Sequence, residues 1–162
     1  MPDELTRVLL VEDDPAHAEL VRRAFEMRGR QVQLQVAETL VEARRCLDAP
    51  LGRPHLVIAD WRLPDGEGLE LLTDDRLVEV PVIIMTSQGN ERVAVGALKA
   101  GALDYVVKSE TTLLDMPHIA ERVLREWEIR SERERMQLAL RASEEKFNKA
   151  FRSSPVAMSM IW

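Results

Sequence analysis

Four short apolar runs, each followed directly by residues suited to phosphate or metal chemistry, constrain the fold of this chain most strongly. They occupy residues 8–11, 56–59, 82–85 and 105–107. Runs rich in Val and Ile, separated by helix-length amphipathic stretches, are typical of the buried strands of a parallel sheet. The carboxyl ends of such strands line up along one edge, where ligands bind. The sequence therefore predicts one crevice that gathers carboxylates, a hydroxyl and an amine.

A fifth strand is expected at 32–36, where apolar and polar residues alternate. Helical patterns begin at Pro15 and after Thr39, a short one follows at 69–72, and another runs from about 91 to 100. The loop at 63–68 is rich in turn residues. Five strand–helix alternations predict an α/β fold, an open doubly wound (βα)5 sandwich around a five-stranded parallel sheet.

Composition narrows the class of protein. The chain has 162 residues, 46% hydrophobic and 31% charged, which is typical of a soluble globular protein. A formal charge of -6 argues against a general nucleic-acid binder, and we expect no nucleic-acid partner. A single cysteine, Cys46, fits a reducing compartment. Since no apolar run approaches the roughly 20 residues that cross a bilayer, we expect a cytoplasmic protein.

The residues at the strand ends form a complete set for phosphoryl transfer. An aspartate can attack a phosphoryl group and form an acyl phosphate, and Asp60 follows the second run. Mg²⁺ prefers oxygen ligands, which Asp13 and Asp60 supply, with Glu12 acting directly or through water. Lys108 and the hydroxyl of Thr86 can bind phosphoryl oxygens. Each residue alone is more often a cap, a turn or a solvated side chain, but their coincidence at four strand ends favours a site.

The chain resembles the response-regulator receiver domains of two-component signalling over residues from about 5 to 127. The matching segments are 8–14, 60–69, 86–87 and 104–108. The resemblance implies a flavodoxin-like fold and a regulatory phosphoacceptor rather than an enzyme. It also implies that Asp60 takes a phosphoryl group from a histidine kinase or a histidine phosphotransfer protein.

The resemblance also assigns roles within the site. Glu12 and Asp13 correspond to the family's acidic pair that holds Mg²⁺, joined by Asp60 and the backbone carbonyl of Arg62. Thr86 and Lys108 match the family's hydroxyl and lysine. Tyr105 matches the aromatic residue that turns inward when the hydroxyl moves toward the phosphoryl group; the alternative is an ordinary half-buried strand residue.

Three positions depart from the family or tune it. Ser109 stands where the family usually has a proline, so the resemblance does not define the geometry of the loop there. Arg62 and Gln88 lie where the family tunes dephosphorylation. A cationic Arg62 would pair with Glu12 or screen the phosphoryl group from water, so we expect a long-lived phosphorylated state.

The last third predicts a different organisation. Residues 1–127 form the expected receiver domain, 128–150 a linker helix, and 151–162 a turn and strand that resemble the truncated start of a PAS domain. This order resembles the amino-terminal half of a hybrid sensor histidine kinase, with a cyclic-dinucleotide enzyme as an alternative. An amphipathic stripe favours a homodimer through this helix, but a charged block breaks its heptads, so a single solvated helix has equal weight.

Two other functions compete. Haloacid-dehalogenase-type phosphohydrolases also form an aspartyl phosphate with Mg²⁺, but they need a second aspartate two residues after the nucleophile, where this chain has Arg62. They also usually carry a cap domain, for which this chain has no room. A pseudo-receiver that only docks partners is the other alternative, and the intact set Asp13, Asp60, Thr86 and Lys108 argues against it.

Overall fold

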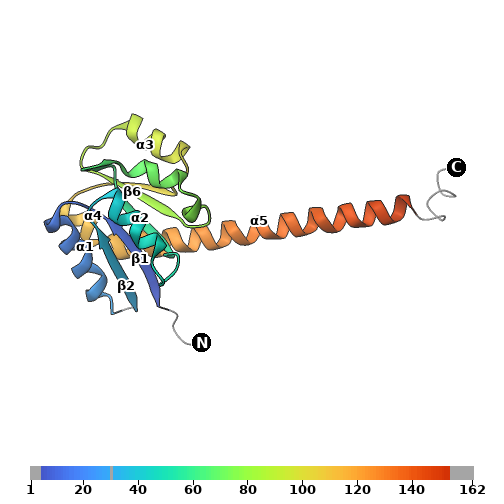
Figure 1. Cartoon of the computed structure of the whole chain (residues 1–162), viewed down its shortest axis with the longest axis horizontal. Coiled ribbons are helices and arrows are strands. Elements are labelled where there is room, and N and C mark those ends of the chain that lie inside the picture. Colours follow the sequence, from blue (N-terminus) through green and yellow to red (C-terminus); the bar gives the residue numbers. More distant parts are fainter. Residues whose placement is uncertain (1–4, 30, 154–162) are drawn as a thin grey trace. The chain divides into compact units, whose positions relative to one another are not determined.

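A five-stranded parallel sheet forms the core of the first part of the chain, as the sequence predicts. The computed structural model describes residues 5–29 and 31–153 (Figure 1). The strands lie in the order β2-β1-β3-β6-β7, with bounds β1 Thr6–Val11, β2 Val32–Ala37, β3 Leu56–Asp60, β6 Val82–Thr86 and β7 Asp104–Val107. All residues of β3 and β6 are buried, which explains their continuous apolar runs.

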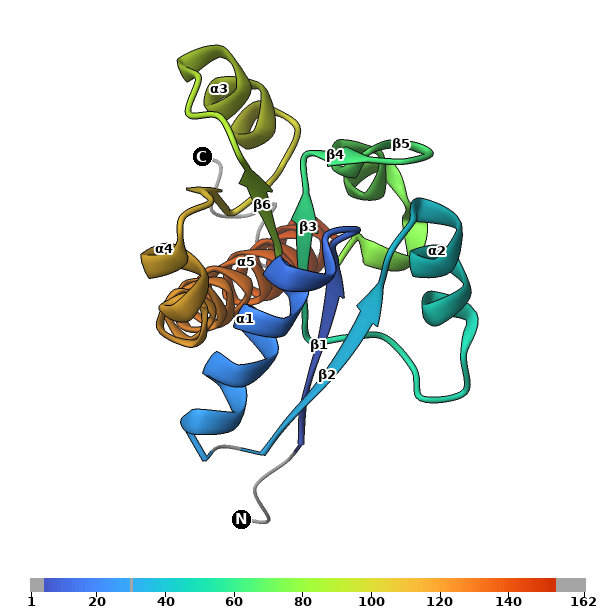
Figure 2. The same cartoon turned by 90° about the vertical axis from the view of Figure 1, so that its left-hand side faces the viewer.

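Helices cover both faces of this sheet, and α1 and α2 lie on opposite faces (Figure 2). Asp14 caps α1, whose first residue is a proline, and Thr39 caps α2. Each face has its own apolar core, one including Leu40 of α2 and the other Val21 of α1. The helices are α1 Pro15–Met27, α2 Leu40–Asp48, α3 Glu91–Lys99, α4 Glu110–Leu114 and α5 Met116–Arg152.

The segment after β3 is more tightly wound than the sequence pattern indicates. The expected loop is a small antiparallel hairpin, β4 (Arg62–Leu63) and β5 (Gly66–Glu67). The expected short helix is 3₁₀ in form, η1 (Gly68–Thr73) followed by η2 (Asp75–Leu77). The carboxylate of Asp74 accepts the N–H of Arg76 and so starts a new cap before an α-helix can develop.

A short helix that the pattern did not predict, α4, precedes the long one. Ser109 caps it, and the side chains of Ser109 and Thr112 each accept the other's backbone N–H. The open question about the loop after Lys108 is thereby answered, because Ser109 begins a helix.

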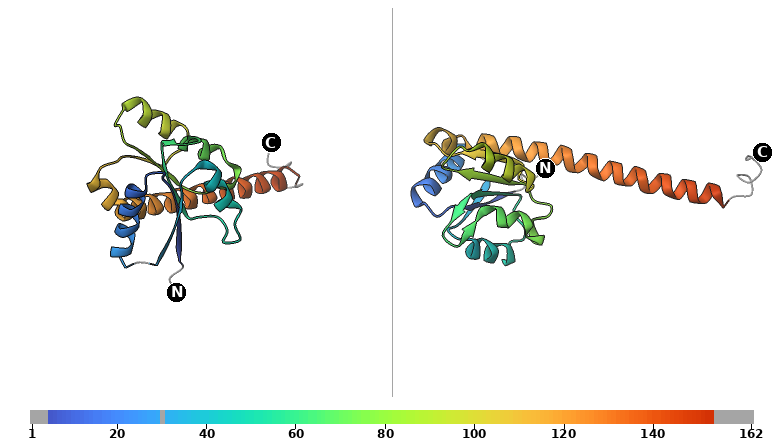
Figure 3. Two further views of the ribbon diagram at one scale, coloured as in Figure 1. Left: turned by 60° about the vertical axis from the view of Figure 1, so that its left-hand side comes forward. Right: turned by 90° about the horizontal axis from the view of Figure 1, so that it is seen from above.

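The described residues fall into two compact units, one ending at Arg125 and the other beginning at Glu126. In the first unit, Met116, Ala120 and Val123 of α5 are buried in the core. In the second unit, α5 runs without a break to Arg152 (Figure 3). Residues 132–153 are exposed.

The end of α5 corrects one expectation. Residues 151–152 are helical where a turn was expected, because the helical pattern continues through them. The rest of the expected PAS start, 154–162, lies outside the described residues. Within the described part of the chain, no helix has the length and apolar character needed to span a membrane.

Candidate functional site

Three carboxylates meet at the carboxyl edge of the sheet. Glu12 and Asp13 directly follow β1, and Asp60 ends the neighbouring strand β3. One carboxylate oxygen from each lies within 4.8 Å of the others. Glu12 and Asp60 are buried, whereas Asp13 is exposed. The parallel register thus brings together the three acids that the sequence analysis selected.

Lys108 is the cation of this cluster. It follows β7, and its backbone N–H donates to the carbonyl of Thr86 at 2.7 Å. Its Nζ donates to Asp60 Oδ2 at 2.7 Å and forms an ion pair with Glu12 Oε2 at 2.8 Å. Burial alone would lower the pKa of Lys108, but the hydrogen bonds to Asp60 and Glu12 raise it above its ordinary value. The amine is therefore held as an ammonium ion.

The charges of the cluster do not balance, since three carboxylates face one ammonium group. Burial raises the pKa of Glu12, and the charge of Asp60 raises it further, although Lys108 opposes both effects. A divalent cation would relieve this excess of negative charge. The donors are all oxygens and lie close together, which is the donor chemistry that Mg²⁺ prefers. The residues present therefore fit this ion.

The hydroxyls of Thr86 and Tyr105 converge on one backbone group. Thr86, buried at the end of β6, donates to the carbonyl of Gln88 at 3.2 Å and accepts the N–H of Gln88 at 3.3 Å. Tyr105, half-buried on β7, donates to the same carbonyl at 3.3 Å. Both hydroxyls therefore hold the loop after β6. The sequence analysis selected Gln88 for a different reason, and nothing in the pattern indicates that its carbonyl is shared.

His17 is a residue of this site that sequence reasoning missed. It lies half-buried in the first turn of α1, with Nδ1 3.4 Å from Lys108 Nζ and 3.8 Å from Glu12 Oε1. Asp14 caps α1, since its carboxylate accepts the N–H groups of Ala16 and His17. These hydrogen bonds lower the pKa of Asp14. The one available signal was the position of His17 just inside a capped helix that begins beside the acidic pair.

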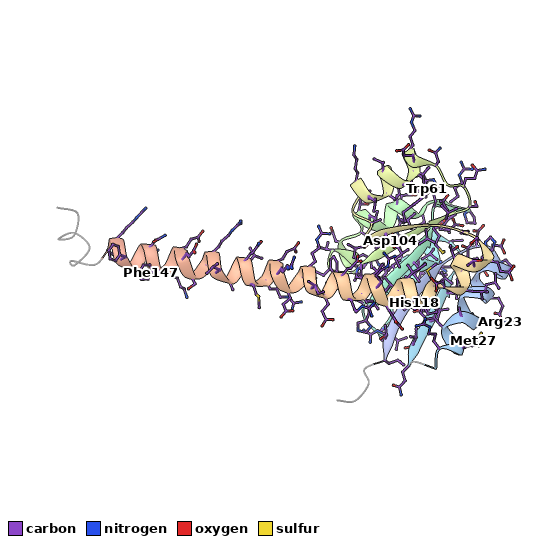
Figure 4. The ribbon with its side chains drawn as sticks, turned by 180° about the vertical axis from the view of Figure 1, so that it is seen from behind. Arg23, Met27, Trp61, Asp104, His118 and Phe147 are labelled. Carbon is purple, nitrogen blue, oxygen red and sulfur yellow. The ribbon has the colours of Figure 1, made fainter. Side chains whose placement is uncertain are left out.

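Gly68 permits a close backbone approach behind the phosphoacceptor candidate. Its N–H donates to the carbonyl of Trp61 at 2.9 Å. A Cβ built on Gly68 would lie 2.1 Å from the carbonyl oxygen of Asp60, closer than any side chain tolerates. Trp61 itself is half-buried and packs against the core near Gly96 of α3 (Figure 4). The glycine within the segment 60–69 thus has a steric reason.

Arg62 extends from β4 with an exposed side chain. Among the residues that the structure describes, it forms no ion pair, and the buried ion pair of Glu12 is with Lys108. Of the two roles that the sequence analysis gave the Arg62 side chain, pairing with Glu12 is therefore not observed. Screening of a phosphoryl group stays a prediction.

Comparison with known sequences finds a family to which this chain is similar. The model of the response regulator receiver domain matches residues 8–117. The methanogenesis regulatory protein FilR1 of Methanothrix harundinacea is 45% identical over 123 residues, covering 74% of this chain and 28% of FilR1. KdpE, the KDP operon transcriptional regulatory protein of Escherichia coli, is 42% identical over 105 residues, covering 64% of this chain and 45% of KdpE. The chain thus spans less than half of either relative.

A shorter relative and two solved structures agree with this match. Chemotaxis protein CheY1 of Helicobacter pylori is 33% identical over 109 residues, 65% of this chain and 86% of CheY1. A CheY-like receiver domain protein from Methanospirillum hungatei has 30% identity and a TM-score of 0.62, covering 78% of this chain and 99% of that one. The Mn²⁺-bound form of the response regulator Rcp1 has 25% identity and a TM-score of 0.61, covering 68% and 88%. The chain belongs to the response regulator receiver domain family.

Proposed function

We propose that this chain is the phosphoacceptor of a two-component phosphorelay and that Asp60 is the residue phosphorylated. The observation that carries the proposal is the hydrogen bond of Lys108 to Asp60, which is buried beside Glu12 in the acidic cluster. A carboxylate oxygen of Asp60 attacks the phosphorus of a phosphohistidine, the P–N bond breaks, and the imidazole leaves with its electron pair. Lys108 then pairs with a phosphoryl oxygen, and Thr86 donates to another.

The proposed reaction depends on Mg²⁺ held by Glu12, Asp13, Asp60 and the backbone carbonyl of Arg62. When bound, the ion neutralises charge on the transferring phosphoryl group. Membership of the receiver family supports this assignment, as does the Mn²⁺-bound form of Rcp1. The uncompensated carboxylates support it independently.

Incubation with acetyl phosphate and Mg²⁺, followed by mass measurement of the intact chain, tests this function. We expect one phosphoryl adduct on the wild type. No adduct should form when Mg²⁺ is chelated before incubation, and none should form on Asp60→Asn. The exposed Asp48→Asn variant is the matched control and should be modified like the wild type. Sustained hydrolysis of phosphate esters would instead support a phosphohydrolase, and the absence of both reactions would support a docking pseudo-receiver.

We propose a regulatory domain rather than an enzyme, located in the cytoplasm, where Cys46 stays reduced. Its phosphodonor is a histidine kinase or a histidine phosphotransfer protein. On phosphorylation, the Thr86 hydroxyl moves from Gln88 toward the phosphoryl group, and the ring of Tyr105 turns inward. The shared carbonyl of Gln88 supports this coupling, because both hydroxyls donate to it and a displacement of the loop at Gln88 reaches both.

The exposed Arg62 supports a long-lived acyl phosphate. A cation two residues after Asp60 lies free to cover the phosphoryl group, since no carboxylate in the described part of the chain holds it. Decay of the isolated phosphoprotein should therefore be slower in the wild type than in Arg62→Ala. Decay of the wild type within seconds would contradict this proposal.

We propose that residues 1–127 pass their signal to a linker helix, 128–150, and onward to a PAS region of a hybrid kinase. We also propose that the linker pairs with a second copy. Met136, Leu140 and Phe147 support the pairing because they are 63, 59 and 68% exposed and lie at spacings of four and seven. Phe147 is labelled on this helix in Figure 4. Light scattering should give a dimer that Leu140→Asp dissociates and the off-stripe variant Leu138→Asp does not. A monomeric wild type contradicts the pairing.

A further inference from the structure

Asp65, in the turn between β4 and β5, holds the amino end of α2. Its Oδ1 accepts the N–H of Leu40 at 2.9 Å, and its Oδ2 accepts the N–H of Val41 at 3.0 Å. These contacts join segments 24 and 25 residues apart in the sequence. The hydrogen bonds from Leu40 and Val41 lower the pKa of Asp65, so the carboxylate stays ionised.

The helix α2 already has a cap of its own. The hydroxyl of Thr39 accepts the N–H of Glu42 at 3.1 Å. The free amides of a helix's first turn can be satisfied by water or by local side chains, so a carboxylate from a distant turn is not required for the helix to form. The contacts of Asp65 therefore do something that Thr39 does not, because they attach the hairpin to the helix.

The hairpin also packs closely against the same helix. Gly66 has a φ of 156°, and a Cβ built on it would lie 2.8 Å from Cδ1 of Leu40. At its far end, Gly68 lies against the carbonyl of Asp60. The segment that carries Arg62 is therefore fixed to Asp60 on one side and to α2 on the other.

The amino end of α2 is connected in turn to the acidic pair. Ala37, the last residue of β2, pairs with Val11, and its carbonyl accepts the N–H of Glu12 at 2.9 Å. One residue separates Ala37 from Thr39. The contacts of Asp65 thus close a ring that runs from Glu12 through β2 and α2 to the hairpin and to Asp60.

We infer that Asp65 is a positioning residue for the cation site, because it fixes the hairpin that carries the Arg62 carbonyl relative to Glu12 and Asp13. This inference rests on the proposed function, in which those groups hold Mg²⁺. Asp65 contributes no ligand in this scheme. Its loss leaves every ligand in the chain but lets one half of the site move relative to the other, which weakens cation binding without altering the chemistry of the bound state.

The test is a calorimetric titration of the full chain with Mg²⁺. It compares the wild type with the variants Asp65→Ala, Asp65→Asn and Thr39→Ala. We expect the Mg²⁺ Kd of Asp65→Ala to rise about tenfold, in the range for residues that orient metal ligands. Asp65→Asn keeps an acceptor oxygen and should recover part of the loss. Thr39→Ala removes a cap from the same helix but leaves Asp65 in place, so its Kd should stay within about twofold of the wild type.

A second readout separates positioning from general damage. At saturating Mg²⁺, the rate of phosphorylation by acetyl phosphate should be the same in Asp65→Ala as in the wild type, while the Mg²⁺ concentration that gives half of this rate should rise with the Kd. If Asp65→Ala fails to fold by circular dichroism, the comparison of Asp65→Asn with Thr39→Ala decides the question.

The outcomes distinguish this inference from the function on which it rests. A wild type that binds no Mg²⁺ contradicts both. A wild type that binds Mg²⁺ and is phosphorylated, beside an Asp65→Ala variant with the same Kd, overturns the positioning role alone. An equal rise of the Mg²⁺ Kd in Thr39→Ala also overturns it. The stability of α2, rather than the hydrogen bonds from α2 to the hairpin, would then determine Mg²⁺ affinity.

Discussion

The ammonium group of Lys108 donates a hydrogen bond to Oδ2 of Asp60 at 2.7 Å, and both side chains are nearly buried. The two residues come from strands that are not neighbours, because β6 lies between β3 and β7. Lys108 spans this gap with its long side chain while its backbone stays bonded to Thr86. The carboxylate proposed to accept a phosphoryl group therefore already faces the cation that would pair with that group.

Replacement of Lys108 by Met should destabilise the chain and increase its dependence on a cation. Glu12 and Asp60 would be left buried without their partner, and loss of one member of a buried ion pair costs about 3 kcal/mol or more. Mg²⁺ should bind the variant more tightly than the wild type and restore much of this stability. Urea unfolding with and without Mg²⁺ measures both effects.

The exposed Lys99→Met variant is the control, and its unfolding free energy should stay within about 0.5 kcal/mol of the wild type. Equal stability of Lys108→Met and the wild type without Mg²⁺ would show that the ammonium group does not compensate the acidic cluster.

Thr86 and Tyr105 should differ in their effects on phosphorylation. Thr86→Ala removes the hydroxyl proposed to bind a phosphoryl oxygen, so the rate of modification by acetyl phosphate should fall about tenfold or more. Tyr105→Phe removes only a long hydrogen bond to Gln88, so its rate should stay near the wild-type rate. Thr86→Ser keeps the hydroxyl and should recover most of the loss. A Tyr105→Phe rate as low as that of Thr86→Ala would contradict these separate roles.

The substitution Gly68→Ala should strongly destabilise the folded chain. The new Cβ would lie 2.1 Å from the carbonyl of Asp60, so the backbone must move, and we expect a loss of about 2 kcal/mol or more with slower phosphorylation. Gly96→Ala places its Cβ 4.0 Å from Trp61 inside helix α3, where alanine is favoured, and should be neutral or stabilising. Chemical unfolding of the pair, with phosphorylation rates, makes the comparison.

The sequence predicted the sheet and the acidic cluster because both follow from period and position along the chain. A buried parallel strand has a continuous apolar run, and the residue at its end must lie at the ligand-binding edge. Contacts that depend on loop geometry left no such pattern. The shared carbonyl of Gln88, the approach of His17 to Lys108 and the tie from Asp65 to α2 join segments whose spacing is set only by the folded chain.

Arg76 should give the chain a pH-dependent increment of stability through Asp74. Its Nε and Nη2 donate to the two oxygens of Asp74, and the hydrogen bonds from Arg76 lower the pKa of Asp74 below its ordinary value of 3.8. The folded chain therefore keeps this carboxylate ionised at a pH where the unfolded chain protonates it. The increment is complete above the ordinary pKa and is lost as the pH falls toward the lower folded value.

The variant Arg76→Met tests this contribution of Asp74 to the free energy of unfolding. It should cost about 1 kcal/mol at pH 7, and the difference between variant and wild type should shrink below pH 4. The capping residues Asp14 and Asp65 titrate in the same range in both proteins, so their effects cancel in the difference. Urea unfolding at pH 7, 5 and 3 gives the series, and a difference independent of pH would contradict the assignment to Asp74.

Ser109 and Thr112 should stabilise the start of α4 as a coupled pair. The hydroxyl of Ser109 accepts the N–H of Thr112 at 3.1 Å, and Oγ1 of Thr112 accepts the N–H of Ser109 at 2.8 Å. Oγ1 of Thr112 also donates to the carbonyl of Val107 at 2.8 Å, which joins α4 to the end of β7.

We expect Ser109→Ala and Thr112→Val each to lower the free energy of unfolding by about 1 kcal/mol. The double variant should cost less than the sum of the two, because either change breaks the reciprocal cap. Additive losses would show that the two side chains act independently. Ser109→Pro should cost at least as much as Ser109→Ala, since proline supplies neither the hydroxyl nor the N–H that Thr112 binds.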